Sequence, residues 1–274
     1  MAEKDYKHIR FEVQENGVAT ITFNLPKMAN AMDLIGVQET LAALHCAEGR
    51  DDVGAVVLTG EGDHAFCAGF NLKAIPLENR NQPALAEHFR ELAMWWHQVL
   101  HKLIHIPKPV LAAVNGVAAG VGLGMTLAAD MAVAVDSATF LCAWHAIGLA
   151  NDAASSYTLV KIVGFRRAME LMLTNRTLSA REAHDWQILN RVYSKEDFRK
   201  NVAIIAGDLA AAPTYLQGFA KERFHMGWRQ SIEECTEFEI RNVMKSISND
   251  RLMPILEKFM SKQMRSDEVK VRIP

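Results

Sequence analysis

Apolar and polar residues alternate on both sides of an Asn-Gly pair near the start of the chain. The segment FEVQENGVATITF spans residues 11–23, with Asn16 and Gly17 at its centre. Asn-Gly between two alternating runs is the strongest short-range signal for a tight β-hairpin. The pattern therefore predicts that the chain opens with two antiparallel strands.

The hydrophobic spacing then switches between helical and strand periods. Residues 33–47, DLIGVQETLAALHCA, have helical spacing after Asp33, a residue type that caps helix N-termini. Short buried strands are predicted for VGAVVLTG at 53–60, KPVLAAVNG at 108–116 and DMAVAVDSATF at 130–140. Strands that alternate with helices favour an α/β layout.

From about residue 160 onward the pattern becomes helical, with charged faces and apolar stripes. The segments that show it are GFRRAMELMLT, SAREAHDWQILNRV, KEDFRKNVAIIAGDLAAA and the long stretch 228–265. No low-complexity linker precedes them. We expect an α/β core over residues 1–200, followed by a helical region over residues 201–274.

The composition of the chain argues against several classes of function. The 274 residues are half hydrophobic and 23% charged, with a formal net charge of -2, so we expect no nucleic-acid partner. A charged N-terminal segment and the lack of a long apolar run predict a cytoplasmic protein with no membrane partner. The four cysteines lack the spacing of a zinc site, which predicts reduced thiols and no bound metal.

Two glycine-containing turns are candidates for ligand binding. FCAGFNL covers residues 66–72, and NGVAAGVGLG at 115–124 leads into a predicted helix. Glycine lets a backbone approach a ligand closely, so both turns could direct N–H groups into one cavity, as an oxyanion requires. The alternative is that these glycines serve packing only. The dinucleotide-binding fingerprint is incomplete here.

A second candidate lies in the segment HFRELAMWWHQVLHKLIHIPKP at 88–109, which has helical spacing. His97, His101 and His105 recur every four residues, but the zinc-binding pattern of a helix with an added Glu is missing. A solvated stripe is the preferred reading for His101 and His105. His97 follows Trp95 and Trp96 directly, which makes it a candidate general base, with a structural histidine as the alternative.

An isolated acid is the third candidate. Asp152 lies in WHAIGLANDAASSY, among Ala, Gly and Ser, without an evident cationic neighbour in the sequence. A carboxylate in such surroundings is costly to bury unless it is paired, hydrogen-bonded or used in chemistry.

These segments resemble a known family. AFCAGFNLKAI and NGVAAGVGLGMTLAADMAVA together resemble the crotonase (enoyl-CoA hydratase/isomerase) superfamily, and the similarity extends over nearly the whole chain. The resemblance implies an α/β fold, a crotonase-like spiral of ββα units with a helical C-terminal trimerisation region that also closes the CoA site. It also implies an acyl-CoA thioester substrate, an oxyanion hole made by the N–H groups of Phe70 and Val121, and Gly120 beside them. Family members commonly have glycine where this chain has Val121, so the turn must accept a β-branched residue.

The catalytic residues of hydratases in this superfamily are not matched. Two glutamates act in those enzymes, and their places here look like Gly124 and Trp144. WWHQ, CAWHAIG and NDAASSY instead resemble the branch that hydrolytically dehalogenates 4-chlorobenzoyl-CoA. By that resemblance Asp152 is the nucleophile, His97 the base, and Trp144 the donor that orients the carboxylate. CoA is then part of the substrate, and no separate cofactor is expected.

The resemblance also suggests substrate contacts. Phe89, Trp96 and Trp95 are candidates for an aromatic pocket around an aroyl group, with a place in the protein core as the alternative. Basic residues that could bind the CoA phosphates, or simply be solvated, are Lys27, Lys73, Lys258, Lys262 and Arg265, the last three from a neighbouring subunit. The expected assembly is a homotrimer or a multiple of it.

Two other functions stay open at this point. A dienoyl-CoA isomerase of the crotonase type can hold an aspartate at the place of Asp152, although it needs a second acid where Trp144 stands. The other alternative is a non-catalytic member of the superfamily that binds acyl-CoA or RNA. The near-neutral charge weakens the RNA version.

Overall fold

The computed structural model describes residues 5–75, 82–227, 229–261 and 271–274. A six-stranded sheet has the order β1-β2-β3-β5-β7-β10, and a four-stranded sheet has the order β4-β6-β8-β9. The large sheet consists of β1 Ile9–Val13, β2 Val18–Phe23, β3 Ala55–Gly60, β5 Val110–Val114, β7 Met131–Val135 and β10 Arg191–Tyr193. The small sheet consists of β4 Ala65–Cys67, β6 Val117–Ala119, β8 Thr139–Leu141 and β9 Leu178–Ser179.

The predicted hairpin is confirmed. β1 and β2 pair antiparallel with Ile9 opposite Phe23, and the tight turn between them holds Gly17 at a φ of 81°. The remaining pairs of the large sheet are parallel. Parallel pairs need crossover connections, which the helices supply.

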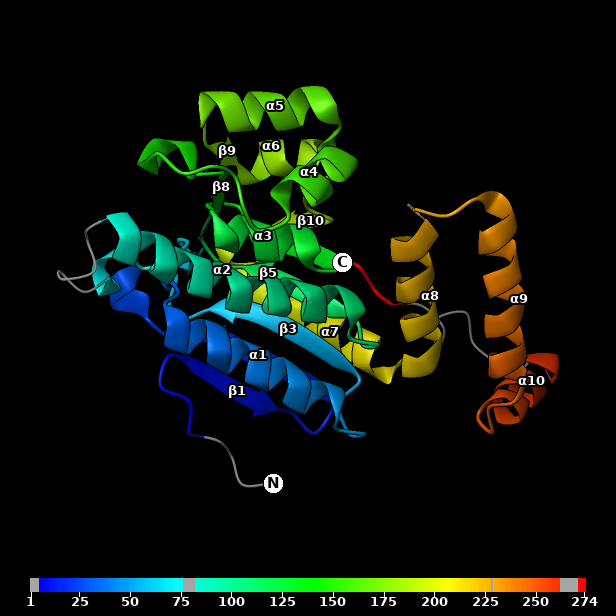
Figure 1. The fold of residues 1–274 in the computed structure, drawn as a ribbon. Coiled ribbons are helices and arrows are strands. Elements are labelled where there is room, and N and C mark those ends of the chain that lie inside the picture. The colour runs from blue at the N-terminus through cyan, green and yellow to red at the C-terminus, as the bar shows by residue number, and fades with distance from the viewer. Residues whose placement is uncertain (1–4, 76–81, 228, 262–270) are drawn as a thin grey trace.

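Helices cover both faces of the large sheet. Figure 1 shows α1, Leu34–Glu48, and α2, Gln82–His105, in front of the sheet, and α7, Lys195–Ala211, behind it. The expected cap of α1 is confirmed, because the Asp33 side chain accepts a hydrogen bond from the Gly36 N–H. α3, Val121–Ala128, is fully buried and begins directly after β6.

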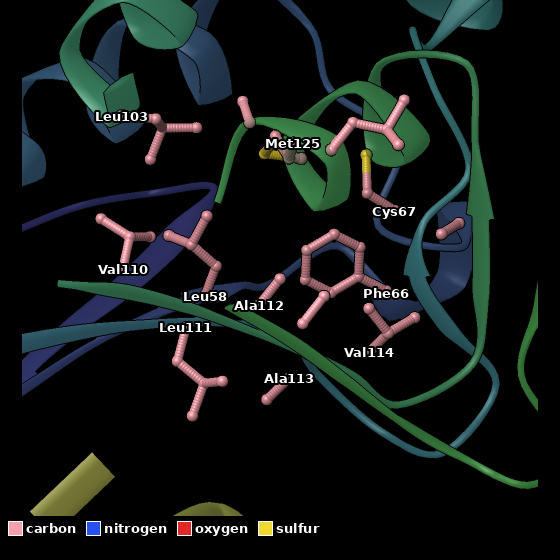
Figure 2. Close-up of a cluster of buried hydrophobic side chains, with 14 of the residues drawn as sticks. Leu58, Phe66, Cys67, Leu103, Val110, Leu111, Ala112, Ala113, Val114 and Met125 are labelled. Carbon is pink, nitrogen blue, oxygen red and sulfur yellow. The ribbon is translucent and has the colours of Figure 1, made fainter. Parts of the chain in front are cut away.

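The core lies between these layers. All five residues of β5 are buried, which explains why this strand is apolar throughout rather than alternating. In Figure 2, Val110 and Ala112 point to the same side as Leu58 of β3, whereas Leu111 and Ala113 point to the opposite side. Both faces of the central strand therefore contribute to one continuous core.

An upper layer and a projecting arm complete the chain. α4 Ser155–Val163, α5 Phe165–Thr174 and α6 Ala180–Asp185 lie with the small sheet at the top of Figure 1. α8 Thr214–Gly227, α9 Ile232–Ile247 and α10 Leu252–Met260 form a group beside the core. The boundary expected at residue 200 falls inside α7, which packs on the sheet.

The long helical pattern over 228–265 is broken in the structure. α9 ends at Ile247 and α10 starts at Leu252, with Ser248 as the C-terminal cap of α9. The short strands β9 and β10 overlap the two ends of the segment 179–192, which the sequence pattern assigned to a helix. None of the helices in the described part of the chain could cross a membrane.

Candidate functional site

An apolar cavity of about 340 Å³ opens between α2, the start of α3 and the loops that flank η4, His145–Ile147. Its described lining consists of Ala68, Gly69, Phe70, Leu72, Phe89, Ala93, Gly120, Val121, Ala143, Trp144, Ile147, Leu149, Ala150 and Asp152. Asp152 is the one carboxylate among these residues. The cavity therefore joins both glycine turns with Phe89, Trp144 and the isolated acid that the sequence singled out.

His97 and Asp152 form a hydrogen-bonded pair at this cavity. The His97 Nε2 atom lies 2.8 Å from Asp152 Oδ1, although the two residues are 55 positions apart. A carboxylate can only accept, so Nε2–H donates and the basic lone pair of the imidazole is on Nδ1. The His97 side chain is 50% exposed and that of Asp152 is 27% exposed, so water and substrate can reach the pair.

The Asp152 loop has an unusual backbone. Ala153 and Ala154 both have positive φ angles, 57° and 53°, in the left-handed region. Each such residue with a Cβ costs about 1 to 2 kcal/mol. The loop passes so close to α3 that a Cβ at Gly124 would lie 2.5 Å from the Ala153 Cβ. The bare Gly124 is therefore what allows the Asp152 loop to take this path.

The two glycine turns meet as the oxyanion hypothesis requires. A Cβ on Gly120 would lie 3.7 Å from the Gly69 Cα, so the turns are neighbours. The Met32 N–H donates to the Gly69 carbonyl and the Asn71 N–H donates to the Met32 carbonyl, which leaves the intervening Phe70 N–H on the opposite side of this parallel bridge.

The second N–H group of the proposed oxyanion hole, that of Val121, lies at a helix N-terminus. Val121 is the first residue of α3, where a backbone N–H has no partner within its own helix. Gly120, the N-cap, takes the positive φ of 53°, so Val121 itself needs only an ordinary helical conformation. This is why a β-branched residue fits in the place where the family commonly has glycine.

Some of the aromatic residues line the cavity, and others pack behind the residues that line it. Phe89 and Trp144 line the cavity. Trp96 is fully buried and stands behind Phe70, with ring centroids 6.0 Å apart in an edge-on arrangement. Trp95 is half-buried against the core. In the described hydrogen bonds Asp152 is paired with His97 and Trp144 does not donate to it, so an orienting role for Trp144 stays a prediction.

The described basic residues of the candidate CoA site lie in three different elements. Lys27 is in the short helix η1, Pro26–Met28, and Lys73 is in η2, Leu72–Ala74; both are exposed. Lys258 is in α10 of the arm. Lys262 and Arg265 lie outside the described residues. Their contacts with CoA phosphates stay predictions.

The histidine stripe of α2 does not form a metal site with other residues. Across the described ranges no group of three or more His, Cys, Asp or Glu side chains is placed to hold a metal ion. The pKa of His105 is lowered by burial and by the nearby cationic groups of His101, His225, Arg229 and Lys221.

Sequence reasoning missed several cavity residues. Leu72, Ala93, Ile147 and Leu149 line the cavity, and none carries a chemical group that would single it out in a sequence. Ala93 had one usable signal: it lies four residues after Phe89 and four before His97, so all three share one helix face.

Comparison with known proteins gives a family and close relatives. The family model of enoyl-CoA hydratase/isomerase matches residues 13–265. The chain is 49% identical to 4-chlorobenzoyl coenzyme A dehalogenase-2 of an Arthrobacter species over 99% of this chain and 97% of that protein. It is 30% identical to the 1,2-epoxyphenylacetyl-CoA isomerase of Escherichia coli, over 82% of this chain and 85% of that one.

Solved structures agree with the family match. The enoyl-CoA hydratase of Bacillus anthracis superposes with a TM-score of 0.87 at 26% identity, covering 93% of this chain and 97% of that chain. The expected crotonase fold is thus confirmed. On the family match and these relatives, the chain belongs to the enoyl-CoA hydratase/isomerase family.

Proposed function

We propose that this protein hydrolytically dehalogenates 4-chlorobenzoyl-CoA to 4-hydroxybenzoyl-CoA through an aspartyl aryl ester. The observation that carries the proposal is the His97–Asp152 pair at an apolar, partly aromatic cavity that the Phe70 and Val121 turns also border. The 49% identity to dehalogenases named for this substrate supports it.

The first step is substitution at the aromatic ring. The thioester carbonyl accepts hydrogen bonds from the Phe70 and Val121 N–H groups, which draws electron density out of the ring toward the oxygen. An Asp152 oxygen attacks C4, so a C–O bond forms and the electron pair enters the ring. The C–Cl bond then breaks with its electron pair, chloride leaves, and the aryl ester remains.

The second step is hydrolysis of that ester. Esterification removes the negative charge of Asp152 and weakens its hydrogen bond with His97. The imidazole can then carry its proton on Nδ1, which leaves the Nε2 lone pair facing a water molecule beside the ester. His97 takes a proton from water as the oxygen attacks the carboxyl carbon of Asp152. The aryl oxygen leaves, and its protonation gives 4-hydroxybenzoyl-CoA with the carboxylate restored. One water enters and one chloride and one proton leave.

The position of the hydratase acids argues against the isomerase alternative. Isomerisation needs a second acid across the substrate. By the family resemblance, Gly124 and Trp144 stand where hydratases have their two catalytic glutamates. Gly124 has no room for a side chain beside Ala153.

The proposal extends to the assembly and the CoA end of the substrate. We place Lys27 and Lys73 near the CoA phosphates, and Lys258 at the phosphates of a neighbouring subunit in a homotrimer. CoA enters as part of the substrate, without a separate cofactor. A cytoplasmic location stays a prediction.

The test separates the two chemical steps. The parent enzyme is expected to release chloride from 4-chlorobenzoyl-CoA continuously. His97→Gln should release one equivalent of chloride per active site and then slow by about two to four orders of magnitude, the usual contribution of a positioned base. Acid quenching and peptide mass analysis should then find the aryl group on the peptide that carries Asp152.

Two results would contradict the proposal. If the parent releases no chloride, the activity assignment is wrong. If His97→Gln releases no chloride and carries no aryl group while the parent is active, His97 acts before the ester forms and the assigned division of labour is wrong.

A further inference from the structure

A second cavity of about 230 Å³ adjoins the substrate cavity. It lies between the start of α1, η2 and the first half of α2, and its described lining consists of Asp33, Leu34, Ile35, Phe70, Asn71, Leu72, Ala74, Ile75, His88, Phe89 and Leu92. Phe70, Leu72 and Phe89 also line the substrate cavity. These three side chains therefore form a partition with a hollow on each side.

The members of the partition are held to different degrees. Phe70 packs edge-on against the fully buried Trp96, and its backbone is pinned by the bridge to Met32, so it cannot move without disturbing the oxyanion turn. Phe89 is half-buried, and the ring packed edge-on against it is that of its own neighbour His88, at 6.3 Å. Phe89 is thus the member that can be altered with least effect on the catalytic groups.

The second cavity offers an apolar environment. Of its polar lining groups, Asp33 accepts from the Gly36 N–H and pairs with His8 at 2.8 Å, and the Asn71 side chain accepts from the Lys73 N–H. The third, His88, packs its ring edge-on against Phe89. The remaining lining is largely aliphatic and aromatic, which suits a hydrocarbon group better than a polar one.

We propose that this second cavity is an accessory subsite for the aroyl group, and that Phe89 sets the size limit of the substrate by separating it from the main cavity. The ligand class is an aroyl-CoA that keeps the halide para to the thioester and carries a fused ring or an apolar substituent on the edge facing Phe89. This inference rests on the proposed dehalogenation.

The test compares two substrates across matched variants. We expect Phe89→Ala to raise the ratio of kcat/KM for 4-chloro-1-naphthoyl-CoA to that for 4-chlorobenzoyl-CoA by at least about tenfold, because several carbons gain a buried site. Ala74 lines the second cavity but not the substrate cavity, so adding Ala74→Met to this variant should fill the second cavity and remove most of the gain. Ala74→Met alone should leave the turnover of 4-chlorobenzoyl-CoA unchanged.

The binding of 1-naphthoyl-CoA, which has no halide, is measured in parallel by calorimetry. Tighter binding to Phe89→Ala than to the parent, reversed by Ala74→Met, supports the subsite even if the proposed dehalogenation fails. A gain that survives Ala74→Met means that the ring occupies only space vacated in the main cavity, and overturns the subsite. An unchanged ratio in a Phe89→Ala enzyme that melts like the parent shows that Phe89 sets no size limit.

Discussion

At the scale of single residues, the backbone of its neighbours places Asp152, the proposed nucleophile. Asp152 precedes two left-handed alanines, and the first of these touches the surface of α3 at Gly124. Conformations of this kind persist only where surrounding packing determines them. The packing that holds Ala153 and Ala154 in these conformations therefore also fixes the direction of the Asp152 side chain.

Asp152→Asn is expected to abolish turnover while leaving the substrate bound. The amide has the shape of the carboxylate but lacks the charge that attacks the ring. The measurement is chloride release together with the Kd of 4-chlorobenzoyl-CoA. Turnover within tenfold of the parent would refute the nucleophile assignment.

Gly124→Ala should displace the Asp152 loop. The added methyl group would meet the Ala153 Cβ at 2.5 Å, an overpacking that typically costs about 1 to 3 kcal/mol of folding free energy. We expect chloride release to fall by more than about tenfold, with a lower melting temperature. Gly49→Ala is the control, because its Cβ would meet only the His45 carbonyl oxygen, at an ordinary 3.6 Å. Equal effects of the two substitutions would contradict the argument.

Two cysteines should be unreactive in the native protein. Burial raises the pKa of both the Cys67 and the Cys142 thiol to about 12, so neither forms the reactive thiolate near pH 8. Cys46 and Cys235 are partly exposed. A thiol reagent at pH 8 should titrate two groups in the folded chain and all four after denaturation. Rapid titration of four groups in the folded chain would contradict this.

The residues of the site differ in how far the sequence could predict them. Asp152 and His97 stood out because an isolated acid and a histidine directly after two tryptophans need explaining. Only the family resemblance assigned them to one site, and only the structure shows their contact across 55 positions. Leu149 and Ile147 could not be found, because in the sequence an aliphatic side chain that lines a cavity looks like any core residue. The location of Trp96 behind Phe70 depends on how α2 rotates against the neighbouring loops, which its own spacing does not determine.

At the scale of elements, the sequence correctly predicted those turns and helix ends whose geometry depends on a few adjacent residues. The Asn16-Gly17 turn and the Asp33 cap need only a few adjacent residues, and both are confirmed. β9 and β10 are too short to show a period of two, so only tertiary pairing makes them strands. The break between α9 and α10 was likewise hidden within a continuous amphipathic pattern.

The C-terminal residues form a further element contact that no local pattern indicated. Arg272 donates to both carboxylate oxygens of Asp208 on α7, at 2.7 and 2.8 Å, and the Tyr193 hydroxyl donates to the carbonyl of Pro274. This segment is therefore attached to the core at two points.

Asp208→Asn should destabilise the protein at neutral pH but not in acid. Arg272 lowers the pKa of Asp208, so the pair's stabilisation is complete above the ordinary pKa of an aspartate, about 3.9, and is lost as pH falls through the lowered value. Because Arg272 is largely exposed and solvent screens the pair, we expect a small loss of stability. Urea unfolding at pH 7 and at pH 2 measures the effect, which should shrink at pH 2, and an undiminished difference at pH 2 would contradict the assignment.

At the scale of the whole molecule, the helical arm is anchored by a buried cation. Lys221 of α8 donates to the carbonyls of Leu103 and Lys108 and to the carboxylate of Asp130. Burial lowers its pKa, and Asp130 opposes that effect. α8 is thereby fixed to the end of α2, whereas α9 and α10 present exposed apolar residues, among them Ile240, Met244 and Ile247.

These exposed residues are expected to be covered by other copies of the chain. Ile240, Met244 and Ile247 recur at helical spacing on one face of α9, and exposed apolar surface of this kind marks protein interfaces. Light scattering should give a mass three times the chain's 30.5 kDa, or a multiple of that. Replacing Ile240 and Ile247 together by Lys should dissociate the assembly, and a monomeric parent at micromolar concentration would refute it.

The close approach of Gly124 and Ala153 also limits which residues position 124 can hold. A side chain at position 124 would force the Asp152 loop off its present path, because its Cβ would lie 2.5 Å from the Ala153 Cβ. Restoring a glutamate at position 124, the place of a hydratase acid by the family resemblance, would therefore require a different path for the loop that carries Asp152.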